Sequence, residues 1–198
     1  MILENSDNNL IEPYGGKLID LLVSHEEREY RRAYAANLPR VQISLRSVCD
    51  LELLATGGFS PCRDLWGRED YLSVLDAMRL ADGTIFPIPV TLPIGKDVNV
   101  KLDGEIALAD QNNNLLAIMR VEEIYQFDRK REAQTAYGTN DARHPTVAEM
   151  NGWQTVNISG SLIIYLCPRG LRARKLPRFC SRRTRRANGR ASASGLRV

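Results

Sequence analysis

The distribution of acidic residues limits where this chain can fold. All 24 Asp and Glu residues lie at or before Glu149. Residues 1–166 hold 16 Lys and Arg, a formal charge of 16 − 24 = −8, whereas residues 167–198 hold 11 Lys and Arg and no acid, a charge of +11. A basic segment with few apolar residues cannot bury enough surface to offset its chain entropy. We therefore expect an ordered domain over residues 1–166 and a disordered Arg-rich tail over residues 167–198.

Composition permits a core but names no activity, because a hydrophobic content of 43% and a charged content of 26% are ordinary globular values. The N-terminus lacks the basic and apolar regions of a secretory signal. The apolar run at 162–167 is too short to cross a bilayer. We expect a cytoplasmic protein with no membrane partner. The four cysteines form no C-x-x-C pair, which favours reduced, structural thiols and no metal site.

Periodicity predicts short helices and strands in a mixed order. Helical spacing of apolar residues covers 17–36, 50–56 and 70–80, and helix with loop is expected over 125–150. Alternation or β-prone composition predicts strands at 40–46, 85–92, 98–102, 105–109, 115–124 and 156–167, with a hairpin turning at Asp103-Gly104. Short strands with a few flanking helices indicate an α+β domain built on a bent sheet or partly open barrel.

The segment DLELLATGGFSPCRDLWG, residues 50–67, turns a helical pattern abruptly into a glycine-rich loop. Asp50 is the expected N-cap of its helix, and Gly57-Gly58 supplies the backbone freedom that ends it. Phe59 is then expected to be a core anchor, and Ser60-Pro61 to begin a turn.

The two histidines are poor candidates for chemistry. His25 lies in a charged stretch with no second ligand at metal spacing, so we expect a surface residue. His144 precedes Pro145 in a turn, where a histidine usually satisfies local backbone groups, so we favour a structural role over a catalytic one.

Several segments together resemble one family. They are PYGG at 13–16, DLELLATGGFSP at 50–61, YLSVLDAMRLADGTIFPIPVTL at 71–92, YGTNDARHPTV at 137–147 and VNISGSL at 156–162. In this order and spacing they resemble the N-terminal domain of ATP sulfurylase, that is, sulfate adenylyltransferase, over about residues 10–165.

That resemblance implies a PUA-like bent β-pseudobarrel with flanking helices, placed before a nucleotidyl-transferase domain. The family joins ATP and sulfate to give adenosine 5′-phosphosulfate and pyrophosphate. Its catalytic motifs, Q-x-R-N and H-x-G-H, belong to the second domain, and neither occurs in these 198 residues. We therefore predict a truncated or remnant enzyme, inactive alone, with no catalytic, cofactor-binding or metal residues and no cofactor. Its partner would be a separate catalytic domain or a second copy of itself.

This chain also departs from the family pattern. After Ser60-Pro61 the family continues into an apolar Gly-Phe-Met segment, whereas this chain has Cys62 to Gly67, CRDLWG. The second Gly of the family pattern at 158–161 is replaced as well. These changes make Cys62–Trp66 the place where loss of a partner domain would show.

The tail leaves two interpretations open. A polycationic arm could bind nucleic acid through phosphates, which would make the chain an RNA-binding PUA-like module. Alternatively, residues 167–198 are out of frame, since Arg, Ser, Ala and Gly are what a shifted GC-rich message tends to encode. We favour the second, because the family pattern ends where the composition changes, and we regard a nucleic-acid partner as unlikely.

Overall fold

The computed structural model describes residues 11–95, 98–153 and 156–165. Its helices are α1 (His25–Ala35), α2 (Leu45–Thr56), α3 (Arg68–Ala77), α4 (Arg129–Tyr137) and α5 (Pro145–Asn151). Its strands are β1 (Arg40–Gln42), β2 (Leu92–Ile94), β3 (Glu105–Ala109), β4 (Leu115–Arg120), β5 (Glu123–Gln126), β6 (Val156–Ser159) and β7 (Leu162–Ile164). The predicted tail, residues 167–198, lies outside the described residues, so its disorder stays a prediction.

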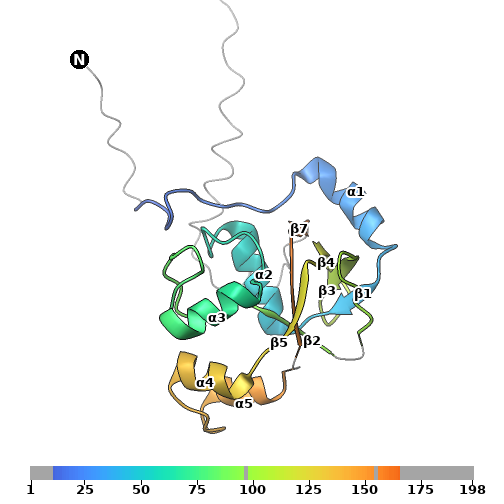
Figure 1. Ribbon diagram of the computed structural model, residues 1–198. Helices are drawn as coiled ribbons and strands as arrows, with labels where there is room; N and C mark the ends of the chain where they lie inside the picture. The colour runs from blue at the N-terminus through green and yellow to red at the C-terminus, as the bar shows by residue number, and fades with distance from the viewer. Residues whose placement is uncertain (1–10, 96–97, 154–155, 166–198) are drawn as a thin grey trace, which may run out of the picture. The chain divides into compact units, whose positions relative to one another are not determined.

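The strands form two sheets, and the chain passes from one sheet to the other four times. One sheet has the order β1-β3-β4-β7 and the other β2-β6-β5, and every pairing except β1 with β3 is antiparallel. The chain enters the second sheet at β2 and returns to the first at β3. It leaves the first sheet again between β4 and β5 and returns between β6 and β7, and we call these last two passages the first and second sheet crossings (Figure 1). Paired strands that change sheets at the same level produce a bent, partly closed barrel, as the sequence predicts.

Gly160 makes the second crossing possible. Its φ of +147° lies in a region that side chains rarely adopt, and a Cβ built on it would lie 1.9 Å from the Arg120 carbonyl oxygen. Backbone hydrogen bonds fix the crossing on both sides: Arg120 N donates to Ser161 O at 3.0 Å and Glu122 N to Ser159 O at 2.9 Å. Only glycine fits where these backbones meet.

The main core fills the space between the sheets and α2 and α3. Its largest fully buried members include Leu51, Leu54, Leu65, Leu92, Leu108, Met119 and Ile158. A smaller, separate cluster joins α4 to α5 through Ala133, Val147 and Met150. Figure 1 shows these two helices side by side, with α3 next to them.

The predicted helix over 17–36 is wrong in its first half. α1 begins at His25 behind the N-cap Ser24, whose side chain accepts from Glu27 N. The preceding residues are extended, because Leu21 N donates to Ala55 O and Val23 N donates to Ile164 O. Those tertiary bonds override the helical spacing of the leucines.

Three strand predictions also need correction. β1 stops at Gln42, because Ser44 caps α2 and residues 45–56 are all helical. Residues 98–102 form no strand, and β3 instead forms a hairpin with β4 around the turn at 110–114. In the 85–92 segment only Ile85, bridged to Arg79, and Leu92 take part in β pairing. Prolines at 87 and 89 remove amide donors there.

Candidate functional site

The 50–67 segment is organised as the sequence predicts at its end but not at its start. The N-cap of α2 is Ser44, whose Oγ accepts from Ser47 N at 3.1 Å, so Asp50 is not a cap but lies inside the helix. Gly57 ends α2 with φ +79°, as expected. Phe59 is half-buried and packs against the core, with its ring 5.8 Å from that of Phe86.

Ser60 joins this segment by a hydrogen bond to Ile19, in the stretch that precedes α1. Its buried Oγ accepts from Ile19 N at 2.9 Å and donates to Gly57 O at 2.8 Å. The peptide bond to Pro61 is cis, which turns the chain into the following loop. Residues 61–67 then form one wall of a cleft.

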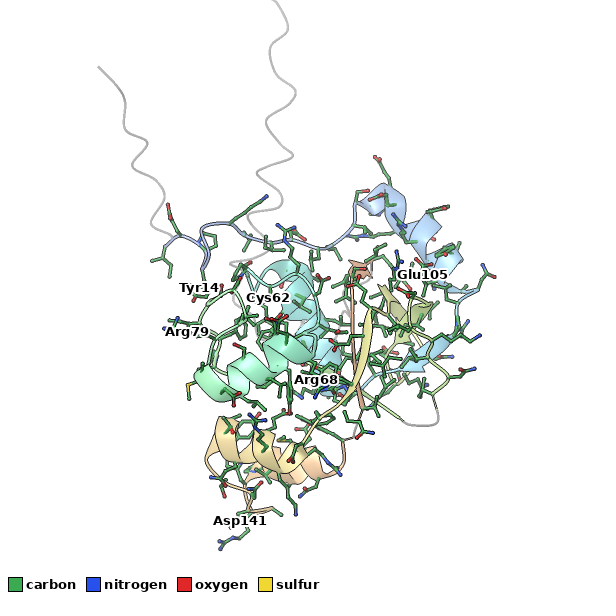
Figure 2. The ribbon with its side chains drawn as sticks, in the orientation of Figure 1. Tyr14, Cys62, Arg68, Arg79, Glu105 and Asp141 are labelled. Carbon is green, nitrogen blue, oxygen red and sulfur yellow. The ribbon has the colours of Figure 1, made fainter. Side chains whose placement is uncertain are left out.

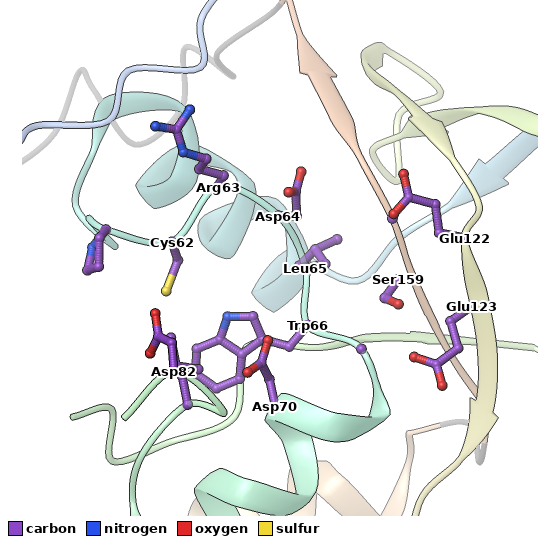
Figure 3. A pocket seen from close by; sticks show the side chains of 14 residues that line it. Cys62, Arg63, Asp64, Leu65, Trp66, Asp70, Asp82, Glu122, Glu123 and Ser159 are labelled. Atoms are coloured by element: carbon purple, nitrogen blue, oxygen red, sulfur yellow. The ribbon is translucent and has the colours of Figure 1, made fainter. Parts of the chain in front are cut away.

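The cleft has a volume of about 570 Å³ and lies between this loop and the two sheet crossings. Figure 3 shows carboxyl groups on both sides of it, and in the view of Figure 2 Cys62 lies on the same side of the domain as Tyr14 and Arg79. The acidic residues that line the cleft are Asp64, Asp70, Asp82, Glu122 and Glu123, and among the described residues Arg63 is the one cation in its lining.

Most of these carboxyl groups hold backbone amides. Glu123 Oε2 accepts from Arg68 N at 2.8 Å and so caps α3, whose N-cap position is Gly67 without a side chain. Asp64 Oδ1 accepts from Leu162 N and Glu122 Oε1 from Ser161 N, both at 3.3 Å. An anionic group at a helix N-terminus stabilises it by about 0.3–1 kcal/mol. These side chains therefore have structural tasks at the points where the sheets and α3 meet.

The two remaining carboxyl groups of the cleft also accept hydrogen bonds from backbone amides. Asp70 Oδ1 accepts from Ala81 N at 2.9 Å and Asp82 Oδ1 from Thr84 N at 2.8 Å. The bonds to Thr84 lower the pKa of Asp82, whereas burial raises the pKa of Asp64.

Cys62 and Trp66 turn inward and form the floor. Burial raises the pKa of the Cys62 thiol to about 11, although a hydrogen bond with Trp66 opposes that rise. A thiol with that pKa is protonated at neutral pH and is a poor nucleophile. The Trp66 ring meets Phe86 edge to face at 4.8 Å, and its carbonyl accepts from the Tyr125 hydroxyl at 2.9 Å. The divergent 62–66 loop thus packs into this domain's own core.

The histidines lie away from the cleft lining. His25 is exposed at the start of α1, as expected. His144 occupies the N-cap position of α5, with Pro145 as the first helical residue, and its ring lies 5.5 Å from that of Tyr137. Its backbone is satisfied, but its side chain makes no capping bond and Nδ1 has no partner. The structural role that the sequence predicts for His144 remains a prediction.

The arrangement offers little to an anionic substrate. Transfer of an adenylyl group needs cationic side chains and backbone amides directed at developing negative charge. Here the amides of the cleft already donate to carboxyl groups, and one arginine faces five acids. Within residues 11–95, 98–153 and 156–165, no three His, Cys, Asp or Glu side chains are grouped so as to hold a metal ion. In the same described part, no helix is long and apolar enough to span a membrane.

Comparison with known proteins identifies the class. A family model described as "PUA-like domain" matches residues 11–165, so the chain belongs to the PUA-like domain family. The hexameric APS kinase from Thiobacillus denitrificans has a similar structure, with a TM-score of 0.62 and 25% identity, over 87% of this chain and 29% of that chain.

The sequence relatives narrow the class to one enzyme family. The sulfate adenylyltransferase of Synechococcus sp. (strain JA-3-3Ab) is 38% identical over 156 residues, which are 78% of this chain and 40% of the relative. That of Deinococcus deserti is 37% identical over 158 residues, 80% of this chain and 40% of the relative. The chain therefore corresponds to the N-terminal PUA-like domain of sulfate adenylyltransferases and spans about two fifths of their length. This confirms the family and fold that the sequence motifs predicted.

Proposed function

We propose that this chain is the non-catalytic N-terminal part of a sulfate adenylyltransferase and forms no adenosine 5′-phosphosulfate alone. The proposal rests on the extent of the match: about 60% of the length of the relatives lies outside it, and the family's Q-x-R-N and H-x-G-H motifs do not occur in this chain. The acidic lining of the cleft supports the proposal, since it would repel ATP and sulfate.

The same proposal gives the domain an assisting role. It acts together with a sulfurylase catalytic domain, and it belongs in the cytoplasm where ATP and sulfate are available. A second copy of this chain is a further candidate partner, and the hexameric assembly of the Thiobacillus denitrificans protein supports such self-association. A nucleic-acid role is disfavoured, because the cleft presents carboxyl groups where phosphates would need cations.

The direct test uses the purified full chain with ATP, sulfate and inorganic pyrophosphatase. We expect phosphate release at the background rate of a reaction without protein. A sulfate-dependent rate above that background would contradict the proposal. A sulfate adenylyltransferase of full length serves as the positive control for the coupled assay.

A further inference from the structure

A buried charged cluster lies where α4 and α5 meet the rest of the domain, away from the cleft. Glu132 on α4 is 1% exposed, and its Oε2 has no hydrogen-bond partner of normal geometry in the described structure. The Tyr71 hydroxyl on α3 interacts with the Glu132 carboxyl but likewise lacks a bond of normal geometry. A carboxyl group in this setting is costly to ionise, because burial removes water and little replaces it.

Arg46 on α2 is the cation of this cluster. Its Nε lies 3.8 Å from Asp50 Oδ2, one turn further along the helix, and its guanidinium lies 4.1 Å above the Trp153 ring. The same guanidinium interacts with Glu132 and with Tyr137. Asp50 also interacts with Glu149 of α5. One arginine therefore faces a buried carboxyl group, Glu132, and a partly buried one, Asp50.

Several titratable groups face this cluster from the neighbouring elements, but burial is what favours a protonated Glu132. From α3 and β5 come the hydroxyls of Tyr71 and Tyr125, from α5 comes Glu149, and Asp128 and Tyr137 flank α4. Burial raises the pKa of Glu132 to about 7, although Arg46 and then Tyr71 oppose the rise.

The α4–α5 unit is also attached through Trp153, which packs against its apolar cluster and against that of Tyr71, Tyr125 and Phe127. Its own apolar cluster is separate from the main core. Arg129 binds the end of α5 through the carbonyls of Asn151 and Trp153, both at 2.9 Å, which keeps the two helices together as one piece. Its contact with α3 includes the exposed ion pair of Arg131 with Asp76. Such a piece can open locally without unfolding the sheets.

We propose that the buried Glu132, next to Arg46 and Asp50, is a proton-operated latch: protonated Glu132 holds the α4–α5 unit (residues 129–151) closed, and loss of its proton favours local opening. The proton passes to solvent. This inference does not depend on the proposed function, since it concerns the domain's own folding equilibrium.

Hydrogen exchange of the full chain, measured from pH 5 to pH 8 and corrected for the chemical exchange rate, tests the latch. A shift from an ordinary carboxyl pKa when open to about 7 when closed predicts that the opening constant of 129–151 rises about tenfold between pH 6 and pH 8. Strands β3 and β4 are the internal control and should show no such rise. Glu132→Gln should remove the rise, and the exposed Glu29→Gln should keep it.

Two results would overturn the latch. One is an equal change in 129–151 and in β3–β4, which would show that opening is global; the other is a rise that persists in Glu132→Gln. Should Glu132→Gln fail to fold, the wild-type comparison between the two segments still decides.

Discussion

Asp50→Asn probes the balance between an ion pair and burial inside α2. Asp50 lies 3.8 Å from Arg46, which by itself would lower its pKa, yet burial outweighs the pair and raises the pKa to about 6 from an ordinary 3.8. Because the folded state holds the proton more tightly, the folded state is favoured below pH 3.8, and this advantage is lost as the pH rises from 3.8 to 6. At 1.36 kcal/mol per pKa unit, the loss is about 3 kcal/mol.

This loss of stability is measured by urea unfolding of Asp50→Asn and of the wild type at pH 4 and pH 8, with tryptophan fluorescence as the signal. Packing and hydrogen-bond changes caused by Asn affect both pH values alike, so the quantity of interest is the change in unfolding free energy at pH 8 minus that at pH 4. We expect Asn to be favoured by about 2–3 kcal/mol in that difference.

Asp103→Asn is the matched control, since Asp103 is exposed, pairs with Arg120 at 3.9 Å, and has a positive φ that Asn tolerates. For Asp103→Asn, the change in unfolding free energy at pH 8 minus that at pH 4 should be below about 0.5 kcal/mol. A difference for Asp50→Asn no larger than this control would show that Asp50 is ionised at its ordinary pKa, and the desolvation argument would fail.

Three further substitutions or labels test the account of the fold. Gly160→Ala should lower the free energy of unfolding in urea by more than about 4 kcal/mol or prevent folding, because its Cβ would meet the Arg120 carbonyl oxygen. Gly83→Ala, at φ +87° but with open space around it, should lower that free energy by about 1 kcal/mol. Equal losses in the two variants would refute the clash at Gly160. Ser44→Ala should lower the unfolding free energy by about 1 kcal/mol, and no change would reject it as the α2 cap. At pH 8, iodoacetamide should label Cys62, identified by peptide mass spectrometry, about 100-fold more slowly than in the urea-unfolded chain, and rapid labelling would contradict its burial.

The sequence was informative where local chemistry decides the structure. Gly57 ends α2 because a left-handed residue is needed there, and the alternation in 105–109 and 115–120 gives the β3–β4 hairpin. The sequence motifs also predict the PUA-like family, which the match over residues 11–165 confirms.

The errors arose where distant residues compete with local pattern. The leucines of 17–24 have helical spacing, but Ala55 and Ile164 offer backbone partners that no local pattern reveals. The sequence predicts Asp50 as the N-cap of α2, whereas the N-cap is Ser44. The local pattern hides Ser44 because it lies inside an alternating run, residues 40–46, that predicts a strand.

The cleft itself could not be predicted, because its carboxyl groups come from segments far apart in the chain. Asp64 and Asp82 flank α3, whereas Glu122 and Glu123 lie at the first sheet crossing. Only the folded sheets bring them together, and the sequence signal for each is an ordinary acid near a turn. The prediction of no catalytic residues remains a prediction, tested by activity alone.

A chimera tests the central claim most directly. Residues 11–165 of this chain replace the matching 156-residue region of the Synechococcus sp. (strain JA-3-3Ab) sulfate adenylyltransferase. Sulfate-dependent pyrophosphate release is then measured for the parent enzyme, the chimera and this chain alone. If this chain is the accessory domain of such an enzyme, the chimera turns over within about tenfold of the parent, a barrier change below about 1.4 kcal/mol, while the chain alone stays at background. A chimera that folds, as judged by circular dichroism, but has no sulfate-dependent activity would contradict the claim.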